Sequence, residues 1–264
     1  MSRILLLGDC HAAWHRLFDG IETVAKREAV DLAIQVGDFG FFGQYAPAPL
    51  GGGNAYRFAV PLHVIDGNHE DHGWLAKQRR AGALSRWAGE QNLHVMSRGS
   101  VLHLDDVTIG FCGGALHADR SQEGSIDRGT TNWLTLREAK TAAQAFSQAK
   151  VDMIVTHSCP HSLGVGMRGS PYLSDTVERY CTLKGHNTGA ISDCGEPGLT
   201  HLWGHLTHRP RLWVFGHFHV HHEVVIERVR FHCVGAIDGS DGRAEPIGYI
   251  LDTASWRMRP VALR

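Results

Sequence analysis

The feature that most constrains the fold is a series of short apolar runs, each of which stops at a small or polar residue. Residues 4–7 stop at Gly8-Asp9, and residues 32–36 stop at Gly37-Asp38. Runs at 62–65, 153–155 and 212–215 end in a similar way. Continuous apolar runs of this length are typical of strands that are buried on both faces. The five runs therefore predict buried strands.

Helices are expected between several of these strands. Residues 12–27 place Leu17, Ile21 and Val24 on one helical face. Residues 71–80 and 135–149 also favour helices. The repeated order of strand, glycine-containing loop and helix indicates α/β architecture.

The middle and the end of the sequence have a different pattern, in which short apolar runs follow one another closely. Runs at 93–96, 101–104 and 107–111 are separated by turns and predict antiparallel hairpins. Runs at 224–226, 231–234 and 247–251 predict antiparallel strands that close the chain. Because no internal repeat or low-complexity linker divides the sequence, we expect residues 1–264 to form one domain.

Composition excludes several classes of protein. The 264 residues are 43% hydrophobic and include seven Trp and ten Phe, so the chain can bury a core and is not disordered. No apolar run approaches the ~20 residues that a transmembrane helix needs. Lys and Arg number 26 against 27 Asp and Glu, which disfavours a nucleic-acid-binding surface. The six cysteines form no C-x-x-C pair and no signal peptide is recognised, so we expect a cytoplasmic protein with reduced thiols.

The residues that follow the five buried strands carry side chains that bind metal ions. In an open α/β sheet, ligands bind outside the carboxyl ends of the strands, so distant residues can meet there. A single Gly-Asp is usually a turn and a single His is usually structural, but five strand ends of this kind favour a metal site. The candidate residues are Asp9, His11, Asp38, Asn68, His69, His157, His217 and His219.

The mixture of side chains indicates which metals the site would take. Imidazole and carboxylate together suit Mn, Fe, Zn, Co or Ni better than Ca or Mg, and we expect Mn first. The set is larger than one tetrahedral ion requires, whereas two ions about 3.5–4 Å apart would use all of it. Asp38 stands alone at its strand end and has two carboxylate oxygens, so it is the natural bridge between two divalent ions.

Five ordered motifs resemble those of the calcineurin-like metallophosphoesterase family. They are GDCH (8–11), GDF (37–39), GNHE (67–70), TH (156–157) and GHFH (216–219). The resemblance implies a four-layer α/β/β/α sandwich of two mixed sheets flanked by helices. It also implies the distribution of ligands, with Asp9, His11 and His219 on one ion, Asn68, His157 and His217 on the other, and Asp38 between them. His69 would lie beside the scissile phosphate as the catalytic general acid or charge partner.

The same resemblance implies the reaction. We expect a metal-dependent phosphoesterase that hydrolyses a phosphomonoester or phosphodiester, of small-molecule or nucleotide-like kind, by direct attack of a metal-bound hydroxide. The sequence Phe39-Gly40-Phe41-Phe42 lacks the Asp-Arg-Gly continuation of the serine/threonine protein phosphatases, which argues against a protein phosphatase. Two alternatives remain: a metal-poor protein-binding scaffold of the same fold, and a nuclease.

Residues outside the motifs are weaker candidates. Irregular stretches at 40–54 and 157–210 are expected to contact substrate. An arginine can hold phosphate through two parallel hydrogen bonds, although a solvated surface role is the alternative. The substrate-binding candidates are His117, Arg120, Arg128 and Arg168. Asp66 and Glu70 are the carboxylates nearest to the motifs and are candidates for orienting the histidines; Glu70 could instead be a helix N-terminal acid.

Overall fold

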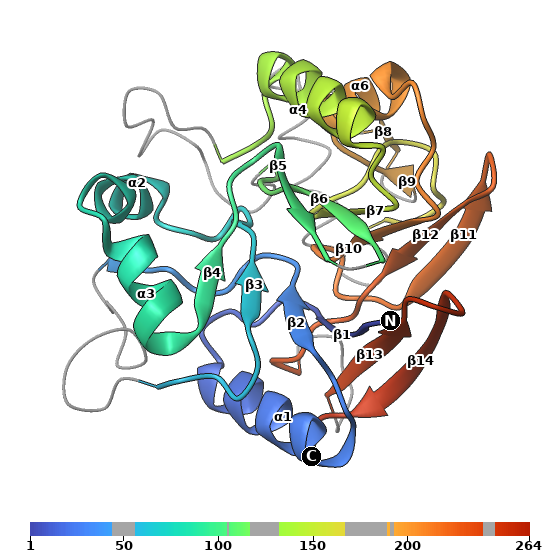
Figure 1. Cartoon of the computed structure of the whole chain (residues 1–264). Helices are drawn as coiled ribbons and strands as arrows, with labels where there is room; N and C mark the ends of the chain where they lie inside the picture. The colour runs from blue at the N-terminus through green and yellow to red at the C-terminus, as the bar shows by residue number, and fades with distance from the viewer. Residues whose placement is uncertain (44–55, 105, 117–131, 167–188, 191–192, 240–245) are drawn as a thin grey trace.

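Two six-stranded sheets stacked face to face form the centre of the computed structural model (Figure 1). The structure describes residues 1–43, 56–104, 106–116, 132–166, 189–190, 193–239 and 246–264. The first sheet has the order β14 (Arg257–Ala262), β13 (Ile247–Asp252), β1 (Arg3–Leu7), β2 (Leu32–Gln35), β3 (Leu62–Val64) and β4 (Leu93–Val95). Strands β1 to β4 are parallel. Strand β13 pairs with β1 and β14 pairs with β13, and both pairs are antiparallel.

The second sheet repeats this mixed design. Its order is β11 (His222–Ile226), β12 (Val229–Cys233), β10 (Leu212–Phe215), β7 (Met153–Thr156), β6 (Thr108–Cys112) and β5 (Ser100–His103). The four central strands are parallel, and the edge strands β11 and β5 are antiparallel to their neighbours. A short hairpin pairs β8 (Gly189–Ala190) with β9 (Asp193–Cys194).

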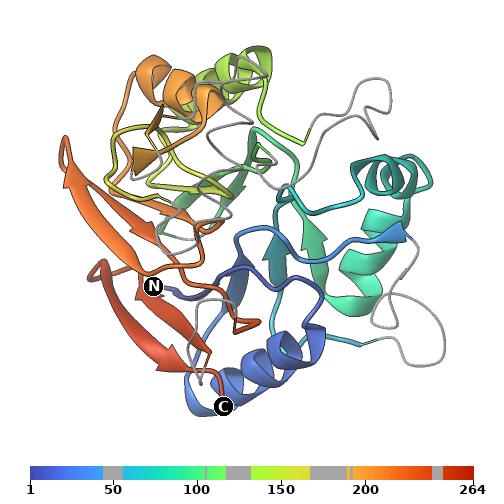
Figure 2. The same cartoon turned by 180° about the vertical axis from the view of Figure 1, so that it is seen from behind.

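Helices cover the outer face of each sheet, and this arrangement gives four layers. The helices are α1 (Trp14–Arg27), α2 (His72–Arg80), α3 (Ala83–Gln91), α4 (Leu136–Ala149) and α6 (Pro197–His205). Side chains of α1, α2 and α3 share a core with the first sheet, while α4 and α6 share one with the second. Figure 2 shows these two helical layers on opposite sides of the sheets. The predicted α/β/β/α sandwich is confirmed.

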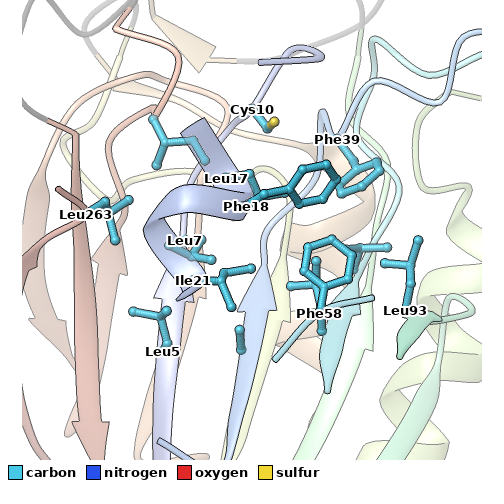
Figure 3. Close-up of a cluster of buried hydrophobic side chains, with 14 of the residues drawn as sticks. Leu5, Leu7, Cys10, Leu17, Phe18, Ile21, Phe39, Phe58, Leu93 and Leu263 are labelled. Carbon is cyan, nitrogen blue, oxygen red and sulfur yellow. The ribbon is translucent and has the colours of Figure 1, made fainter. Parts of the chain in front are cut away.

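Strand β1 shows why the apolar runs have no polar alternation. Its side chains alternate between faces, so Leu5 and Leu7 pack beneath Leu17 and Ile21 of α1, as Figure 3 shows. Ile4 and Leu6 point the other way, into the core between the two sheets. Because both faces are covered, every position in the run from residue 4 to residue 7 must be apolar.

Some element boundaries and strand directions differ from the predictions. Helix α1 begins at Trp14 rather than at residue 12, because His11 and Ala12 have positive φ angles (44° and 65°) that no helix accommodates. Strand β4 pairs in parallel with β3 instead of forming a hairpin, since α2 and α3 form the crossover that parallel pairing requires. Strand β12 is likewise parallel to β10, although it is antiparallel to β11 as predicted.

Five elements were not predicted: helix α3, strand β14, and helix α6 with the short strands β8 and β9, which lie inside the stretch interpreted as irregular. Signals for the two helices were present. Asn92 ends α3 in the left-handed conformation that asparagine tolerates, and Pro197 occupies the start of α6, where its missing N–H costs nothing. Residues 44–55, most of the other irregular stretch, lie outside the described residues.

The length and polarity of the helices bear on membrane insertion. In the part of the chain that the structure describes, every helix is too short or too polar to cross a membrane. Cys10, Cys112, Cys159, Cys194 and Cys233 are buried. The single-domain organisation and the cytoplasmic location stay predictions.

A buried histidine between the sheets, His63, predicts how stability depends on pH. His63 is 7% exposed, stacks on His94 of the next strand at 4.7 Å between ring centroids, and its Nδ1 has no partner among the described residues. Burial, with His94 beside it, lowers the pKa of His63 to about 4. The unfolded chain takes up this proton near the usual value of about 6.5, so stability falls as the pH drops from about 6.5 towards 4.

We therefore expect the free energy of unfolding to decrease by up to about 1.4 kcal/mol per pH unit in this range. Urea unfolding at several pH values measures the slope. His63→Phe keeps a ring against Phe111 but cannot be protonated, so its slope is expected to be shallower. Equal slopes for the variant and the natural chain would contradict this explanation.

Candidate metal centre

The loops that follow β1, β2, β3, β7 and β10 meet at one edge of the sandwich. Backbone hydrogen bonds join them directly: the N–H groups of Cys10 and His11 both donate to the carbonyl oxygen of Asp38, at 3.1 and 2.7 Å. Gly216 N–H donates to the His157 carbonyl oxygen at 2.8 Å, which joins the two loops of the second sheet. The predicted meeting of distant residues at the strand ends therefore occurs.

One group of donor atoms lies between the first and last motifs. The Nε2 atoms of His11 and His219 are 2.9 Å apart, and His219 Nε2 lies 3.1 Å from Asp9 Oδ2. His11 Nε2 also lies 3.7 Å from Asp38 Oδ2. The donor atoms of Asp9, His11 and His219 all fall within 4.8 Å of one another, so they can hold one cation.

A second group adjoins the first through Asp38. His157 Nε2 lies 3.3 Å from Asp38 Oδ2 and 3.0 Å from Asn68 Oδ1. The other ring nitrogen of His157 bonds to the Val36 carbonyl oxygen at 2.8 Å, which fixes the orientation of the imidazole. The His217 ring lies against that of His157, at 5.0 Å between centroids. Asp38 stands between the two groups, as a bridging ligand would.

The backbone around these residues is strained. Non-glycine residues with positive φ are uncommon, yet His11, Asp38, His217 and His219 all adopt such angles, of 44°, 54°, 69° and 53°. Such conformations cost free energy and persist where the surrounding structure enforces them, which is typical of functional sites. This strain is independent support for a functional site here.

Two glycines of the motifs have a steric role. A Cβ on Gly67 would overlap the Asp38 carboxylate and backbone nitrogen, and a Cβ on Gly216 would overlap the carboxylate of Asp9. The glycine before Asn68 thus lets β3 approach the Asp38 loop, and the glycine before His217 does the same for Asp9. Glycine is needed at these two positions because the donor groups of neighbouring loops occupy the space beside them.

The electrostatics of the site favour positive charge. Burial opposes ionisation of Asp38, but the facing His157 imidazole keeps the pKa of that carboxyl well below its usual range. Burial also works against protonation of His157, yet Asp38 and Asp9 raise its pKa to about 10. Burial and the charge on His157 lower the pKa of His217 to about 3. The two buried carboxylates therefore favour a positive charge among the imidazoles, as a site for cations requires.

These donors fit divalent transition-metal ions. Carboxylate oxygens, imidazole nitrogens and one amide oxygen converge from both sheets, and their number exceeds what a single tetrahedral ion uses. Asp38 shares one group of three donors with Asp9 and His157, and another with His11 and His69. The arrangement suits two neighbouring ions with Asp38 between them.

His69 lies beside this cluster. Its backbone N–H donates to Asp38 Oδ1 at 2.8 Å, and its ring is 5.1 Å from that of His11. A ring nitrogen of His69 also falls within 4.8 Å of donor atoms of His11 and Asp38. The side chain therefore reaches the edge of the centre.

Asp66 and Glu70 were candidates for orienting the candidate metal-binding histidines. Their contacts are with other groups. Glu70 accepts hydrogen bonds from three backbone N–H groups, and burial together with Asp38 raises its pKa to about 8. It is not the capping residue of α2 either, because Asp71 accepts the bond from Trp74 N at 2.8 Å. Asp66 lies 3.7 Å from His72, which is not one of the candidate ligands.

Arg98 is a structural partner of the site that sequence reasoning missed. Its Nε and Nη2 atoms lie 3.0 and 2.7 Å from Asp66 Oδ2, and it also donates to the carbonyl oxygens of Asn132 and Trp133. Asp66 directly precedes the turn that contains Asn68 and His69. Arg98 stands in a turn with no recognisable motif, so nothing in the sequence indicated this pairing.

The substrate-binding candidates cannot be placed. His117, Arg120, Arg128 and Arg168 lie outside the described residues, so their role stays a prediction.

Fold and site together define a class of protein. A four-layer sandwich that gathers carboxylates and imidazoles at the ends of its strands is the architecture of a metallophosphoesterase. The model of the calcineurin-like phosphoesterases matches residues 2–221, so the chain belongs to that family, whose members are hydrolases of phosphate esters. The family was identified correctly from the five motifs.

Individual relatives are more distant. A lariat debranching enzyme of Schizosaccharomyces pombe is 25% identical over 251 residues, which cover 85% of this chain and 49% of that protein. The chain thus spans about half the length of this curated relative. The structure of TT1561 of Thermus thermophilus has a TM-score of 0.55 at 11% identity and covers 100% of this chain and 99% of that one. A putative 5′-nucleotidase of Staphylococcus aureus has a TM-score of 0.54 at 13% identity, over 98% of this chain and 52% of that one. The two structural likenesses show a shared fold.

Proposed function

We propose that the protein is a metal-dependent phosphoesterase that hydrolyses a phosphomonoester or phosphodiester of small-molecule or nucleotide-like kind. The observation that carries this proposal is the position of Asp38 between two groups of donor atoms. Asp9, His11 and His219 would hold one ion and Asn68, His157 and His217 the other, with Asp38 shared. Manganese is the first candidate, and iron, zinc, cobalt or nickel would also suit these ligands.

A pair of divalent ions, when bound, supplies an activated water and offsets negative charge on the phosphoryl oxygens. The protein supplies the rest. The strained loops hold the donor groups in place before substrate arrives, so little reorganisation is needed during the reaction. His69 would face the substrate and donate a proton to the departing oxygen, or pair with its charge.

Asp38→Asn tests the central assignment. The variant keeps the shape of the side chain but removes the charge that two ions would share, so we expect the affinity for Mn²⁺ to fall. Removing a group that hydrogen-bonds a metal ligand lowers metal affinity by about 10–100-fold. Loss of the charge on the bridging ligand itself should lower the Mn²⁺ affinity by more than this. Isothermal titration of metal-free protein measures it. Asp31→Asn, at an exposed carboxylate that accepts a bond from Arg3 N, is the control and should bind like the natural chain.

A substrate panel separates this function from its alternatives. The metal-loaded protein would be assayed with p-nitrophenyl phosphate, bis-p-nitrophenyl phosphate, nucleoside monophosphates, cyclic and dinucleoside phosphates, and single-stranded oligonucleotides. The name of the curated relative adds a branched oligonucleotide to this panel. Turnover of oligonucleotides alone would favour a nuclease. Absence of both metal binding and turnover would favour a protein-binding scaffold and would contradict the proposal.

A further inference from the structure

Glu70 makes an unusual set of contacts for a buried carboxylate. Its side chain accepts hydrogen bonds from three consecutive backbone N–H groups of another loop. Phe39 N donates to Oε1 at 2.8 Å, while Gly40 N and Phe41 N donate to Oε2 at 3.1 and 2.7 Å. Glu70 is 7% exposed, so these bonds form away from solvent. The contacts join the turn after β3 to the loop after β2.

That loop begins with Asp38, whose conformation needs support. Asp38 has a φ of 54°, and Gly40, two residues later, has a φ of 99°. On one side, the N–H groups of Cys10 and His11 bind the Asp38 carbonyl oxygen. On the other side, the three residues that follow Asp38 in the chain donate the N–H groups that Glu70 binds. Glu70 therefore determines the path of the backbone just beyond Asp38.

The ordinary explanations for a glutamate at this position do not apply. Asp71, not Glu70, caps helix α2 through Trp74 N. The hydrogen bonds of Glu70 go to backbone amides rather than to a histidine ring. A glutamate side chain also presents two oxygens to these three donors, whereas the amide of a glutamine presents only one.

We propose that Glu70 is a positioning residue that holds Asp38 in the orientation needed to bridge two metal ions. Glu70 does not touch the ions or the substrate. It acts through the 39–41 backbone, and it ties this loop to the turn that presents Asn68 and His69. The proposal rests on the proposed function, because it takes the occupants of the site to be a pair of divalent cations.

Glu70→Gln is the sharpest variant, since it preserves size and leaves one oxygen in place. Its amide group would face an N–H donor, so at least one of the three bonds is lost. We expect Mn²⁺ affinity to fall by about 10–100-fold, as for other partners of metal ligands. The electron paramagnetic resonance spectrum of the Mn²⁺-loaded variant should lose the exchange coupling that a carboxylate bridge transmits between two ions.

A matched control separates positioning from general loss of stability. Ser255→Ala removes a hydroxyl that donates to Asp252 Oδ1 at 2.8 Å in the turn between β13 and β14. Because Asp252 pairs with Arg3, this turn lies at the opposite end of β1 from the metal centre. Both variants should lower the melting temperature of the metal-free protein, but Ser255→Ala should keep the natural Mn²⁺ affinity and coupled spectrum. If Glu70→Gln also keeps them, the positioning role is wrong while the proposed function stands. If the natural chain binds no Mn²⁺, both are wrong.

Discussion

Replacing His69 by alanine is expected to lower turnover by about 10²–10⁴-fold while both metal ions stay bound. The imidazole lies at the edge of the donor cluster, 5.1 Å from the His11 ring, and the His69 backbone N–H donates to Asp38 Oδ1. Loss of the ring removes a proton donor but none of the seven proposed ligands. Steady-state turnover and metal content per chain, measured on the same preparation, test this expectation.

The choice of substrate distinguishes a proton donor from a charge partner. Nitrophenolate departs without protonation, whereas an alkoxide needs a proton. A general acid therefore matters more for an alkyl ester than for bis-p-nitrophenyl phosphate. If His69 is the general acid, His69→Ala should lose more turnover with the alkyl ester. A similar loss with both substrates would indicate the charge partner.

His103→Ala is a suitable control, because His103 is exposed on the edge strand β5. It should retain natural turnover with either substrate. A parallel loss of metal content and activity in His69→Ala would instead make His69 a ligand. The His69 ring nitrogen lies close enough to donor atoms of His11 and Asp38 to share a cation with them, so the metal content has to be measured together with turnover.

Replacing Arg98 by methionine is expected to destabilise the fold by about 3–5 kcal/mol, because it leaves the carboxylate of Asp66 buried without its charge partner. Asp66 is 7% exposed, and although burial opposes its ionisation, Arg98 lowers its pKa. Arg98 also binds the Trp133 carbonyl oxygen and Glu138, so it connects the turn after β3 to the beginning of α4. Chemical denaturation of the metal-free protein measures the change in the free energy of unfolding.

Two further variants show whether the loss comes from the buried charge. Lys26→Met breaks an i,i+4 ion pair with Glu22 in which Lys26 is 77% exposed, so about 0–1 kcal/mol is expected. In the double variant Arg98→Met/Asp66→Asn no charge is left buried, so it should be less destabilised than the sum of its single variants. Equal losses for Arg98→Met and Lys26→Met would show that burial of the Arg98–Asp66 pair adds nothing to its contribution to stability.

Local sequence was sufficient for the elements whose pattern is set by burial and spacing. The run from Ile4 to Leu7 has to be apolar throughout, because one face meets α1 and the other meets the second sheet. The five motifs were equally informative, since Asp9, Asp38, Asn68, His157 and His217 each follow a strand whose carboxyl end lies at the same edge. The family and the candidate ligands could therefore be predicted from the order of the residues alone.

Contacts between distant segments were beyond that reasoning. The direction of β4 depends on the path that α2 and α3 take, and no residue within β4 specifies it. Glu70 has a carboxylate that suits several roles, and the three N–H groups that it binds belong to residues about thirty positions earlier in the chain. The sequence around Arg98 does not distinguish it from other arginines, because its partner Asp66 is 32 positions earlier in the chain.

The sequence by itself determined which strands are buried, which residues bear donor groups and which family of phosphoesterases the chain belongs to. These properties depend on the residue type and on its position relative to a strand end, which are local. The tertiary structure alone decided how the donor groups are held: the left-handed backbone at His11, Asp38, His217 and His219, the orientation of His157 by Val36, and the ties made by Glu70 and Arg98. Those features depend on distances between segments that only folding brings together.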